Sequence, residues 1–255
     1  MGNAAQAFAV LIAILTDIHG NREALEACLA HAGRRPIDRY VFLGDLVGYG
    51  ADPGFVIDTA KDFSSRGAIV LLGNHDSAAI GNPERMNDEA TLAIEWTRRQ
   101  LTGEQREFLK SLPLTAEDDD RLYVHASAAS PASWDYVLDE RGASRSLMAT
   151  EAAVTFCGHT HLPAFFYMTA TGKIAGFDPD AGVAMPLTQQ RRWVAVIGAV
   201  GQPRDRNPAA CYALYDDGPR TLTYFRVPYD IDTAAQKIRD AGLPSFLAAR
   251  LAWGR

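Results

Sequence analysis

The first third of the chain repeats one order of positions: an apolar run, a short polar turn, and a segment with helical character. The apolar runs span residues 9–15, 40–43 and 68–72. Residues 23–31 place apolar side chains at helix-face spacing, and residues 55–63 form a second candidate helix. This repeated strand–turn–helix order predicts parallel βαβ units with right-handed crossovers. Ligands gather at the carboxyl ends of the strands in such sheets, and each polar turn falls there.

The remainder of the chain predicts further helices and a series of short strands. Helices are expected over residues 88–100, 233–240 and 245–253, and Thr102 to Gln105 is a capping-box pattern that opens another helix. Short apolar runs, several of them separated by turn signals, predict strands at residues 122–125, 154–157, 165–168, 173–177, 193–197, 211–215 and 221–227.

A βαβ first part followed by a β-rich second part predicts two sheets packed face to face. The expected fold class is α+β / α/β, as a four-layer αββα sandwich in which helices flank two mixed β-sheets. The chain has 255 residues and no repeat, low-complexity tract or dividing linker, so we expect a single domain over residues 1–255. Its motif-bearing core is expected over residues 9–215, with a C-terminal strand and helices over 221–255. Whether residues 178–192 form a lid is left open.

Composition and charge narrow the class of partner. Hydrophobic residues make up 47% and charged residues 22%, which is typical of a folded soluble protein rather than a disordered chain. The formal charge of -6 disfavours a nucleic-acid-binding surface, because such a surface needs a basic face. Anionic substrates stay open, since bound divalent metals can reverse the local potential.

The cysteines and the first apolar stretch predict a cytoplasmic protein without a membrane partner. The cysteines are widely and irregularly spaced and indicate no disulfide framework, which favours a reducing compartment: Cys28, Cys157 and Cys211. Residues 7–15 lack a preceding basic region, and Asp17 and His19 follow where a signal peptide has small residues. The stretch is also too short to span a bilayer, so we interpret it as a buried strand.

The polar turns hold the candidate chemistry. Every histidine except His31 lies in a turn after an apolar run, and acidic or amide residues accompany them: His19, His75, His125, His159, His161, Asp17, Asp45, Asn74 and Asp76. Oxygen and imidazole ligands without thiolates suit Mn²⁺, Fe or Zn²⁺ rather than a cysteine-rich structural zinc site. Glycines beside these residues allow tight turns and close backbone approach.

In this arrangement the chain resembles the calcineurin-like metallophosphoesterases. The ordered motifs of that family are D-x-H, G-D, G-N-H-[DE], an isolated His, and G-H-x-H. All occur here in that order, as Asp17-Ile18-His19, Gly44-Asp45, Gly73-Asn74-His75-Asp76, His125 and Gly158-His159-Thr160-His161. One such motif alone would be weak, whereas the complete ordered set, over residues 9–215, makes the resemblance specific.

The resemblance implies a dinuclear metal centre. Asp17, His19 and His161 would hold the first metal, and Asn74, His125 and His159 the second. Asp45 would bridge both, because a carboxylate has two oxygens. The implied cofactors are two divalent or trivalent ions, with Mn²⁺ favoured and Fe, Zn²⁺, Co²⁺ or Ni²⁺ as alternatives. A bridging hydroxide would attack phosphorus in line with the leaving oxygen.

The resemblance also gives roles to His75 and Asp76. His75 would not be a ligand; it would protonate the leaving group or stabilise the transition state, and Asp76 would orient its ring. The alternative for Asp76 is a helix N-cap.

The second motif indicates a branch of the family. It continues as Gly44-Asp45-Leu46-Val47-Gly48-Tyr49-Gly50, without the phosphate-clamping arginine of the protein phosphatases. The run is similar to that of the bacterial small phosphodiesterases and diadenosine-tetraphosphatase-like hydrolases, in which G-Y-G is common. Two further segments are near matches to motifs of that branch: His125-Ala126-Ser127 and Gly198-Ala199-Val200-Gly201-Gln202-Pro203-Arg204.

Candidate substrate contacts are few. Arg22 and Arg204 could replace the missing arginine, although an exposed helix arginine and a solvated loop arginine are the alternatives. Tyr49 could stack on a base or cover the edge of the core. A set of aromatic residues is expected in the core rather than as a nucleobase platform: Trp134, Tyr136, Phe165, Phe166 and Tyr167.

The expected function is hydrolysis of a small phosphate ester, either a phosphodiester or a nucleotide, by a metal-dependent phosphoesterase. The alternatives are a protein Ser/Thr phosphatase and a non-catalytic scaffold of the same fold. Retention of His75 and of every implied ligand argues against the scaffold. The sequence does not indicate an oligomeric state.

Overall fold

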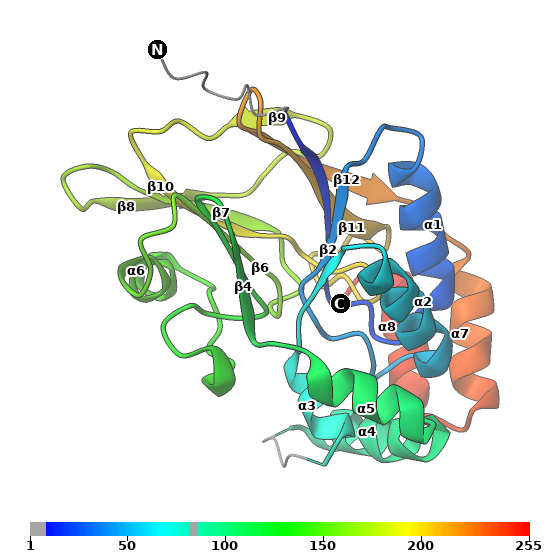
Figure 1. Ribbon diagram of the computed structural model, residues 1–255. Coiled ribbons are helices and arrows are strands. Elements are labelled where there is room, and N and C mark those ends of the chain that lie inside the picture. Colours follow the sequence, from blue (N-terminus) through cyan, green and yellow to red (C-terminus); the bar gives the residue numbers. More distant parts are fainter. Residues whose placement is uncertain (1–8, 82–85) are drawn as a thin grey trace.

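The computed structural model describes residues 9–81 and 86–255, so the first two residues of the apolar stretch 7–15 lie outside it. Two six-stranded mixed sheets form the centre of the molecule (Figure 1). The first sheet has the order β3-β2-β1-β11-β12-β9, from β1 (Leu11–Leu15), β2 (Arg39–Phe42), β3 (Ile69–Val70), β9 (Ala184–Pro186), β11 (Ala210–Asp216) and β12 (Thr221–Val227). The second sheet has the order β4-β5-β6-β10-β7-β8, from β4 (Thr115–Asp118), β5 (Arg121–Val124), β6 (Val154–Cys157), β7 (Ala164–Met168), β8 (Ile174–Phe177) and β10 (Arg192–Val196).

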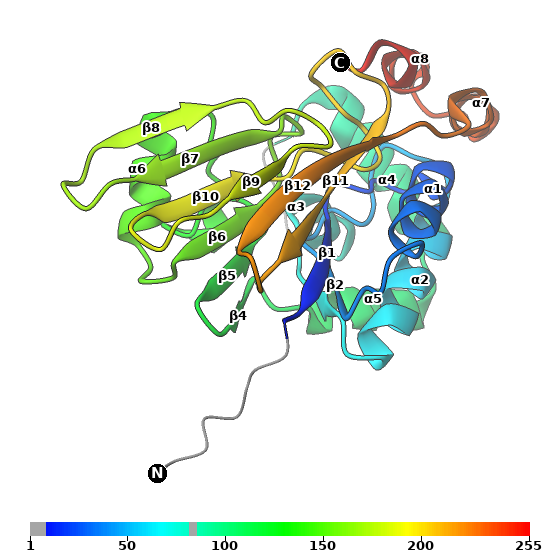
Figure 2. The same ribbon diagram turned by 90° about the horizontal axis from the view of Figure 1, so that it is seen from above.

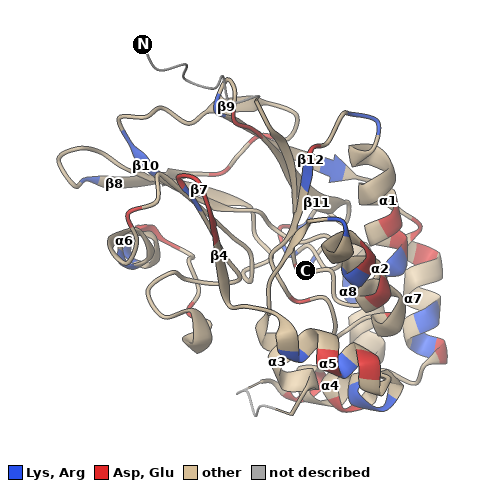
Figure 3. Ribbon diagram, viewed as in Figure 1, with Lys and Arg blue, Asp and Glu red and all other residues tan. Residues whose placement is uncertain are grey.

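Helices cover the outer faces of both sheets, as Figure 2 shows from above. The α-helices are α1 (Arg22–Ala32), α2 (Pro53–Ser65), α3 (Asn74–Ala79), α4 (Asp88–Gln100), α5 (Gly103–Ser111), α6 (Glu140–Met148), α7 (Ile231–Asp240) and α8 (Ser245–Trp253), with a 3₁₀ turn at Pro131–Ser133. Helices α1 and α2 pack on the first sheet, with α7 beside α1 and α8 beside α7, whereas α6 packs on the second sheet. The predicted αββα sandwich of two mixed sheets is confirmed. Lys, Arg, Asp and Glu lie mainly on the outer helices and at strand ends (Figure 3).

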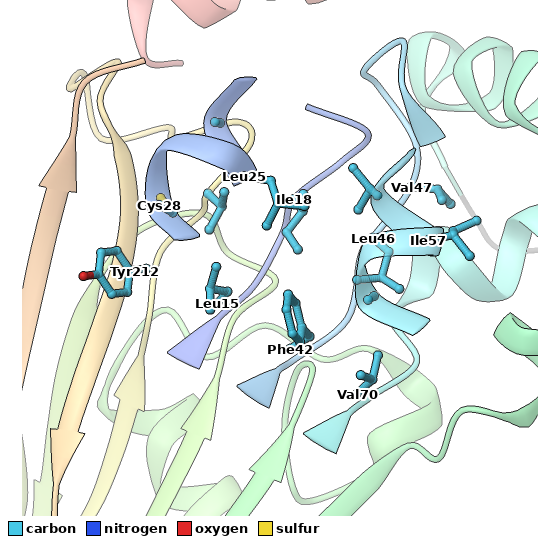
Figure 4. Close-up of a cluster of buried hydrophobic side chains, with 14 of the residues drawn as sticks. Leu15, Ile18, Leu25, Cys28, Phe42, Leu46, Val47, Ile57, Val70 and Tyr212 are labelled. Atoms are coloured by element: carbon cyan, nitrogen blue, oxygen red, sulfur yellow. The ribbon is translucent and has the colours of Figure 1, made fainter. Parts of the chain in front are cut away.

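Alternation along the strands builds separate apolar layers. In β1, Ile12 and Ile14 face the second sheet, while Ala13 and Leu15 face the helices. Figure 4 shows the helix-side layer, where Leu15 lies close to Leu25 of α1. Because side chains alternate across a strand, a strand buried on both faces reads as a continuous apolar run. Burial on both faces of β1 therefore explains the continuous apolar run at residues 9–15.

Parallel pairing brings the polar turns to one edge. β1, β2 and β3 are parallel neighbours, with Leu15 opposite Phe42 and Phe42 opposite Val70. β5, β6 and β10 are likewise parallel neighbours in the second sheet. The turns that follow these strands therefore meet at the carboxyl ends, as the sequence predicts.

The sequence missed several elements of the described chain. β4 has the polar sequence Thr-Ala-Glu-Asp and pairs only with β5 at a sheet edge, so it carries no apolar signal. α6 follows a loop and places only Gly142, Ala143, Ser146 and Leu147 in the interior, which is a weak apolar stripe. α3 spans six residues within the Gly-Asn-His-Asp motif and its extension.

Residues 178–192 do not cover the polar turns. They contain β9, which pairs with Thr221–Thr223 of β12. That part of β12 pairs with the end of β11, where Asp216 lies opposite Leu11 at the start of β1. The segment thus lies at the amino end of β1, opposite the turn that follows it. No described helix has the length and apolar character needed to cross a membrane.

We expect Phe156→Ala to lower the free energy of unfolding by about 3–5 kcal/mol. Phe156 is fully buried between the sheets, with its ring 5.5 Å from that of Tyr123 and 5.4 Å from that of Tyr215. Truncation to alanine would leave a cavity between the two sheets, because the surrounding structure relaxes only partly. Urea denaturation measures the change, with Leu92→Ala on α4 as the control, expected within about 0.5 kcal/mol of wild type because Leu92 is exposed. Equal stability of the two variants would contradict the packing described.

Candidate metal centre

The motif turns adopt backbone conformations that are rare for residues with side chains. Positive φ angles occur at Asp17 (52°), His19 (51°), Asp45 (52°), His159 (68°) and His161 (61°). Each such conformation costs roughly 1–3 kcal/mol and persists only where the surroundings enforce it. Here backbone hydrogen bonds tie the turns together: the amides of Ile18 and His19 both donate to the Asp45 carbonyl, each at 2.9 Å. The fold therefore holds these side chains in fixed directions.

Two glycines of the motifs are required by close approach. A Cβ at Gly73 would lie 2.2 Å from both the amide nitrogen and Oδ1 of Asp45. A Cβ at Gly158 would lie 2.2 Å from Oγ1 of Thr16 and 2.5 Å from Oδ2 of Asp17. The absence of a side chain at these positions lets the turns of both sheets converge.

The turns bring together two groups of side chains able to hold a metal ion. Within each group the ligand atoms lie within 4.8 Å of one another, and all the residues are buried. The first group is Asp17, His19, Asp45 and His161, and the second is Asp45, His125 and His159. Asn74 adds an amide oxygen to the second group, because its Oδ1 lies 3.2 Å from Nε2 of His125. Asp45 belongs to both groups.

Backbone carbonyls fix the tautomer of three of these imidazoles. Nδ1 of His19 donates to the Val47 carbonyl at 2.9 Å, and Nδ1 of His161 donates to the Gln202 carbonyl at 2.7 Å. Nδ1 of His125 donates to the Leu43 carbonyl at 3.0 Å, in the same way. A carbonyl can only accept, so Nε2 presents a lone pair in the neutral rings of His19 and His161. Against the effect of burial, Asp45 raises the pKa of His125 to about 9, so Nε2 of that ring carries a proton that a bound metal ion would displace.

These lone pairs face one another and a carboxylate. Nε2 of His19 lies 3.1 Å from Nε2 of His161, and the latter lies 3.4 Å from Oδ1 of Asp17. Among the described residues, Asp17 Oδ1 is buried without a hydrogen-bond partner. Lone pairs and an unpartnered carboxylate oxygen repel one another unless a cation lies between them. The donor set therefore fits divalent metal ions.

Burial and charge set the protonation of the ligands. Burial lowers the pKa of His19 and His161 well below the usual range and that of His159 to about 3, which keeps the metal-binding neutral form. Burial raises the pKa of Asp17 to about 7. Burial acts in the same direction on Asp45, but neighbouring imidazoles outweigh it, His125 foremost, and hold the pKa of Asp45 well below its usual range.

His75 lies beside the first group. Its ring centroid is 4.8 Å from that of His19 and 4.5 Å from that of Tyr49. Its Nδ1 is buried and finds no hydrogen-bond partner in the described part of the chain. This atom packs against Gly48, where an added Cβ would lie only 2.4 Å away. Burial lowers the pKa of His75 to about 4, so the ring is neutral near pH 7.

The resemblance implied that Asp76 orients the His75 ring, but Asp76 accepts hydrogen bonds from the backbone instead. Its oxygens accept hydrogen bonds from the backbone amides of Gly73, at 3.0 Å, and Val47, at 3.1 Å. Asp76 is the third residue of α3, and Gly73 is the N-cap, so Asp76 is not itself the cap. The carboxylate instead joins the start of α3 to the loop after Asp45.

The three candidate substrate residues occupy different surroundings. Tyr49 is buried, and its ring centroid lies 4.7 Å from that of His19. Arg204 donates to Oε1 of Gln202 at 2.9 Å, and its Nη2 lies 3.5 Å from the Tyr49 hydroxyl. Arg22 is bound to Glu26 at 3.2 Å and lies over the Phe55 ring, and no hydrogen bond joins it to either ligand group within residues 9–81 and 86–255.

Some supporting residues had no signal that sequence reasoning used. Thr16 donates to Oδ2 of Asp17 at 3.0 Å and directly precedes the first motif.

Of the aromatic set expected in the core, Phe165 and Phe166 are buried as predicted. Tyr136 is not: half of its surface is exposed, and its ring stacks on His159.

Comparison with known proteins identifies the family of the chain. Residues 10–217 match the model of the calcineurin-like phosphoesterase superfamily domain. An uncharacterized protein of Methanocaldococcus jannaschii is 32% identical over 251 residues, which cover 96% of this chain and 98% of the relative.

Solved structures resemble the whole chain. A metallophosphoesterase from Sphaerobacter thermophilus is 37% identical, with a TM-score of 0.86 over 97% of this chain and 100% of its own. A hypothetical protein from Pyrococcus horikoshii is 21% identical, with a TM-score of 0.78 over 96% of this chain and 99% of its own, and shares the fold. Taken with the family match, these likenesses show that the chain belongs to the calcineurin-like phosphoesterase superfamily.

Proposed function

We propose that the protein hydrolyses a small phosphate ester, a phosphodiester or a nucleotide, with two metal ions, Mn²⁺ being favoured. The observation that carries this proposal is the place of Asp45 in both ligand groups. One carboxylate shared by two adjacent ligand groups is the arrangement that a two-metal hydrolase needs. The first ion would be held by Asp17, His19, Asp45 and His161, and the second by Asp45, Asn74, His125 and His159.

Such ions, when bound, supply an acidified water and neutralise charge on the phosphoryl oxygens. The chain itself supplies rigid ligands, because backbone carbonyls hold Nδ1 of His19, His125 and His161. It also excludes bulk water, since these side chains are at most 2% exposed. Because the ligands are fixed and bulk water is excluded, few side chains and water molecules need to rearrange as charge develops in the transition state.

His75 is proposed to stabilise the transition state by donating a hydrogen bond to the leaving oxygen. Its Nδ1 faces Gly48 without an acceptor in the described chain, so the hydrogen of the neutral ring is better placed on Nε2. Contacts with His19 and Tyr49 fix the ring plane. Asp76 supports this arrangement indirectly, through the backbone at the start of α3.

Arg204 is the better of the two arginine candidates for a phosphate contact. It forms no ion pair with a carboxylate of the described chain, and its Nε is buried without a partner there. Its charge also acts on His161 and His75, lowering the pKa of both rings after the larger effect of burial. Arg204 thus presents an uncompensated positive charge beside the first group, with Tyr49 supporting the guanidinium.

Metal-dependent turnover and metal content test the proposal. We expect hydrolysis of bis(4-nitrophenyl) phosphate after loading with Mn²⁺, and loss of turnover after chelation. Asp45→Asn should lose metal from both groups and lower kcat/KM more than about 100-fold, since even residues that only orient ligands cost 10–100-fold. Elemental analysis after dialysis gives the metal content.

Asp62→Asn is the matched control, because Asp62 is exposed on α2 and pairs with Arg66. It should bind metal and turn over like wild type. Full metal content in Asp45→Asn, or absence of turnover with Mn²⁺, Fe²⁺, Co²⁺ and Zn²⁺ alike, would contradict the proposal.

His75→Gln should keep its metal and lose about 10²–10⁴-fold in kcat. The loss should be smaller for a 4-nitrophenyl ester than for an alkyl ester, because a good leaving group needs less stabilisation of the negative charge that develops on its oxygen. His31→Gln is the control, since His31 lies on α1 and contacts Tyr212 instead. Equal losses for both esters would remove the leaving-group role from His75.

A further inference from the structure

We propose that Tyr136 forms a stacking surface for a planar, uncharged aromatic group of the substrate, such as a nucleobase or an aryl group. This inference rests on the proposed function, because it places the phosphate at the ligand groups. Tyr136 lies in the segment between β5 and α6, drawn in green in Figure 1.

The Tyr136 ring lies directly beside the second ligand group. Its centroid is 4.2 Å from that of His159, and the two planes differ by 15°, which is a stacked arrangement. His159 is only 6% exposed, whereas Tyr136 is 50% exposed. One face of the tyrosine ring therefore covers a candidate ligand while much of its surface stays open to solvent.

The segment that carries Tyr136 is anchored on both sides. Trp134 is 9% exposed, has a φ of 55°, and its ring meets that of His125 edge-on at 5.8 Å. Val137 is 2% exposed in the layer beneath α6. Gly142 of α6 lets the segment approach closely, since a Cβ there would lie 3.0 Å from the Tyr136 carbonyl oxygen. These contacts fix the backbone of the segment, and the stack on His159 orients the Tyr136 ring.

The segment around Tyr136 carries exposed side chains of several kinds. Asp135, Asp139 and Glu140 are acidic and Arg141 is basic, so their charges offset one another in part. Leu138, two residues after Tyr136 and 59% exposed, adds apolar surface to the segment. A base or aryl group can stack on such a surface without bringing charge.

A pair of phosphate ligands that differ in the base tests the inference by affinity rather than by turnover, and each ligand is checked to be unhydrolysed at the end of the titration. We expect the Mn²⁺-loaded enzyme to bind adenosine 5′-monophosphate about tenfold or more tightly than ribose 5-phosphate, by titration calorimetry. Tyr136→Leu should abolish this preference while leaving the affinity for ribose 5-phosphate unchanged. Tyr136→Phe should retain it, because the ring remains.

Trp253→Leu is the matched control, since it removes another exposed aromatic side chain, on α8, and should keep the preference. No preference in wild type, failure to bind either ligand, or an unchanged preference in Tyr136→Leu would overturn the inference. Equal weakening of both ligands with loss of Mn²⁺ would also overturn it and make Tyr136 a support for His159. Base-dependent binding without any ester hydrolysis would instead contradict the proposed function alone.

Discussion

The carboxylate of Asp45 is the constraint on which the site depends. Its Oδ1 accepts a hydrogen bond from the His75 amide at 2.8 Å, which ties it to the start of α3. Its Oδ2 lies 3.4 Å from Nε2 of His125 and 3.6 Å from Nε2 of His19. His19 follows a strand of the first sheet and His125 one of the second, so a single buried carboxylate contacts both halves of the sandwich. Because a buried charge without partners costs several kcal/mol, the ends of the two sheets are held together wherever this group stays ionised.

The opposite end of the sandwich is joined by a second set of charges. Arg121 of β5 is 5% exposed and binds Asp118 at 3.1 Å and Asp217, which follows β11, at 3.4 Å. Arg39 of β2 pairs with the same Asp118. With the apolar layer between them, the sheets are fixed at both ends. Ligands that arrive on different sheets can therefore keep a common geometry, which a site built on loops alone would not secure.

The sequence predicted the parts of this arrangement that depend on local pattern. Apolar runs followed by polar turns located β1 and β2, and the parallel order placed Asp17 and Asp45 at one edge, as found. The features that the sequence analysis missed depend on tertiary contacts rather than on local pattern. The β4 strand is polar because it lies at an edge, and its existence depends on pairing with β5. Asp76 was expected to orient the His75 ring, but its oxygens accept from the local Gly73 amide at the start of α3 and from the Val47 amide, which only the tertiary fold brings close. Tyr136 was grouped with core aromatics, because no pattern in the chain shows that its segment reaches His159.

The surroundings of the two ligand groups differ, so the two sides of the site would contact different parts of a substrate. Arg204 and Tyr49 lie beside the first group, where His161 and His19 are, so positive charge accumulates on that side. Tyr136 lies beside the second group, where its ring stacks on His159. A phosphate held by metal ions in the two groups would then have its charged oxygens drawn toward Arg204 and an uncharged substituent directed toward Tyr136. Specificity in this fold would thus come from the segments around a common set of metal ligands, because the ions held by those ligands would contact only the phosphate.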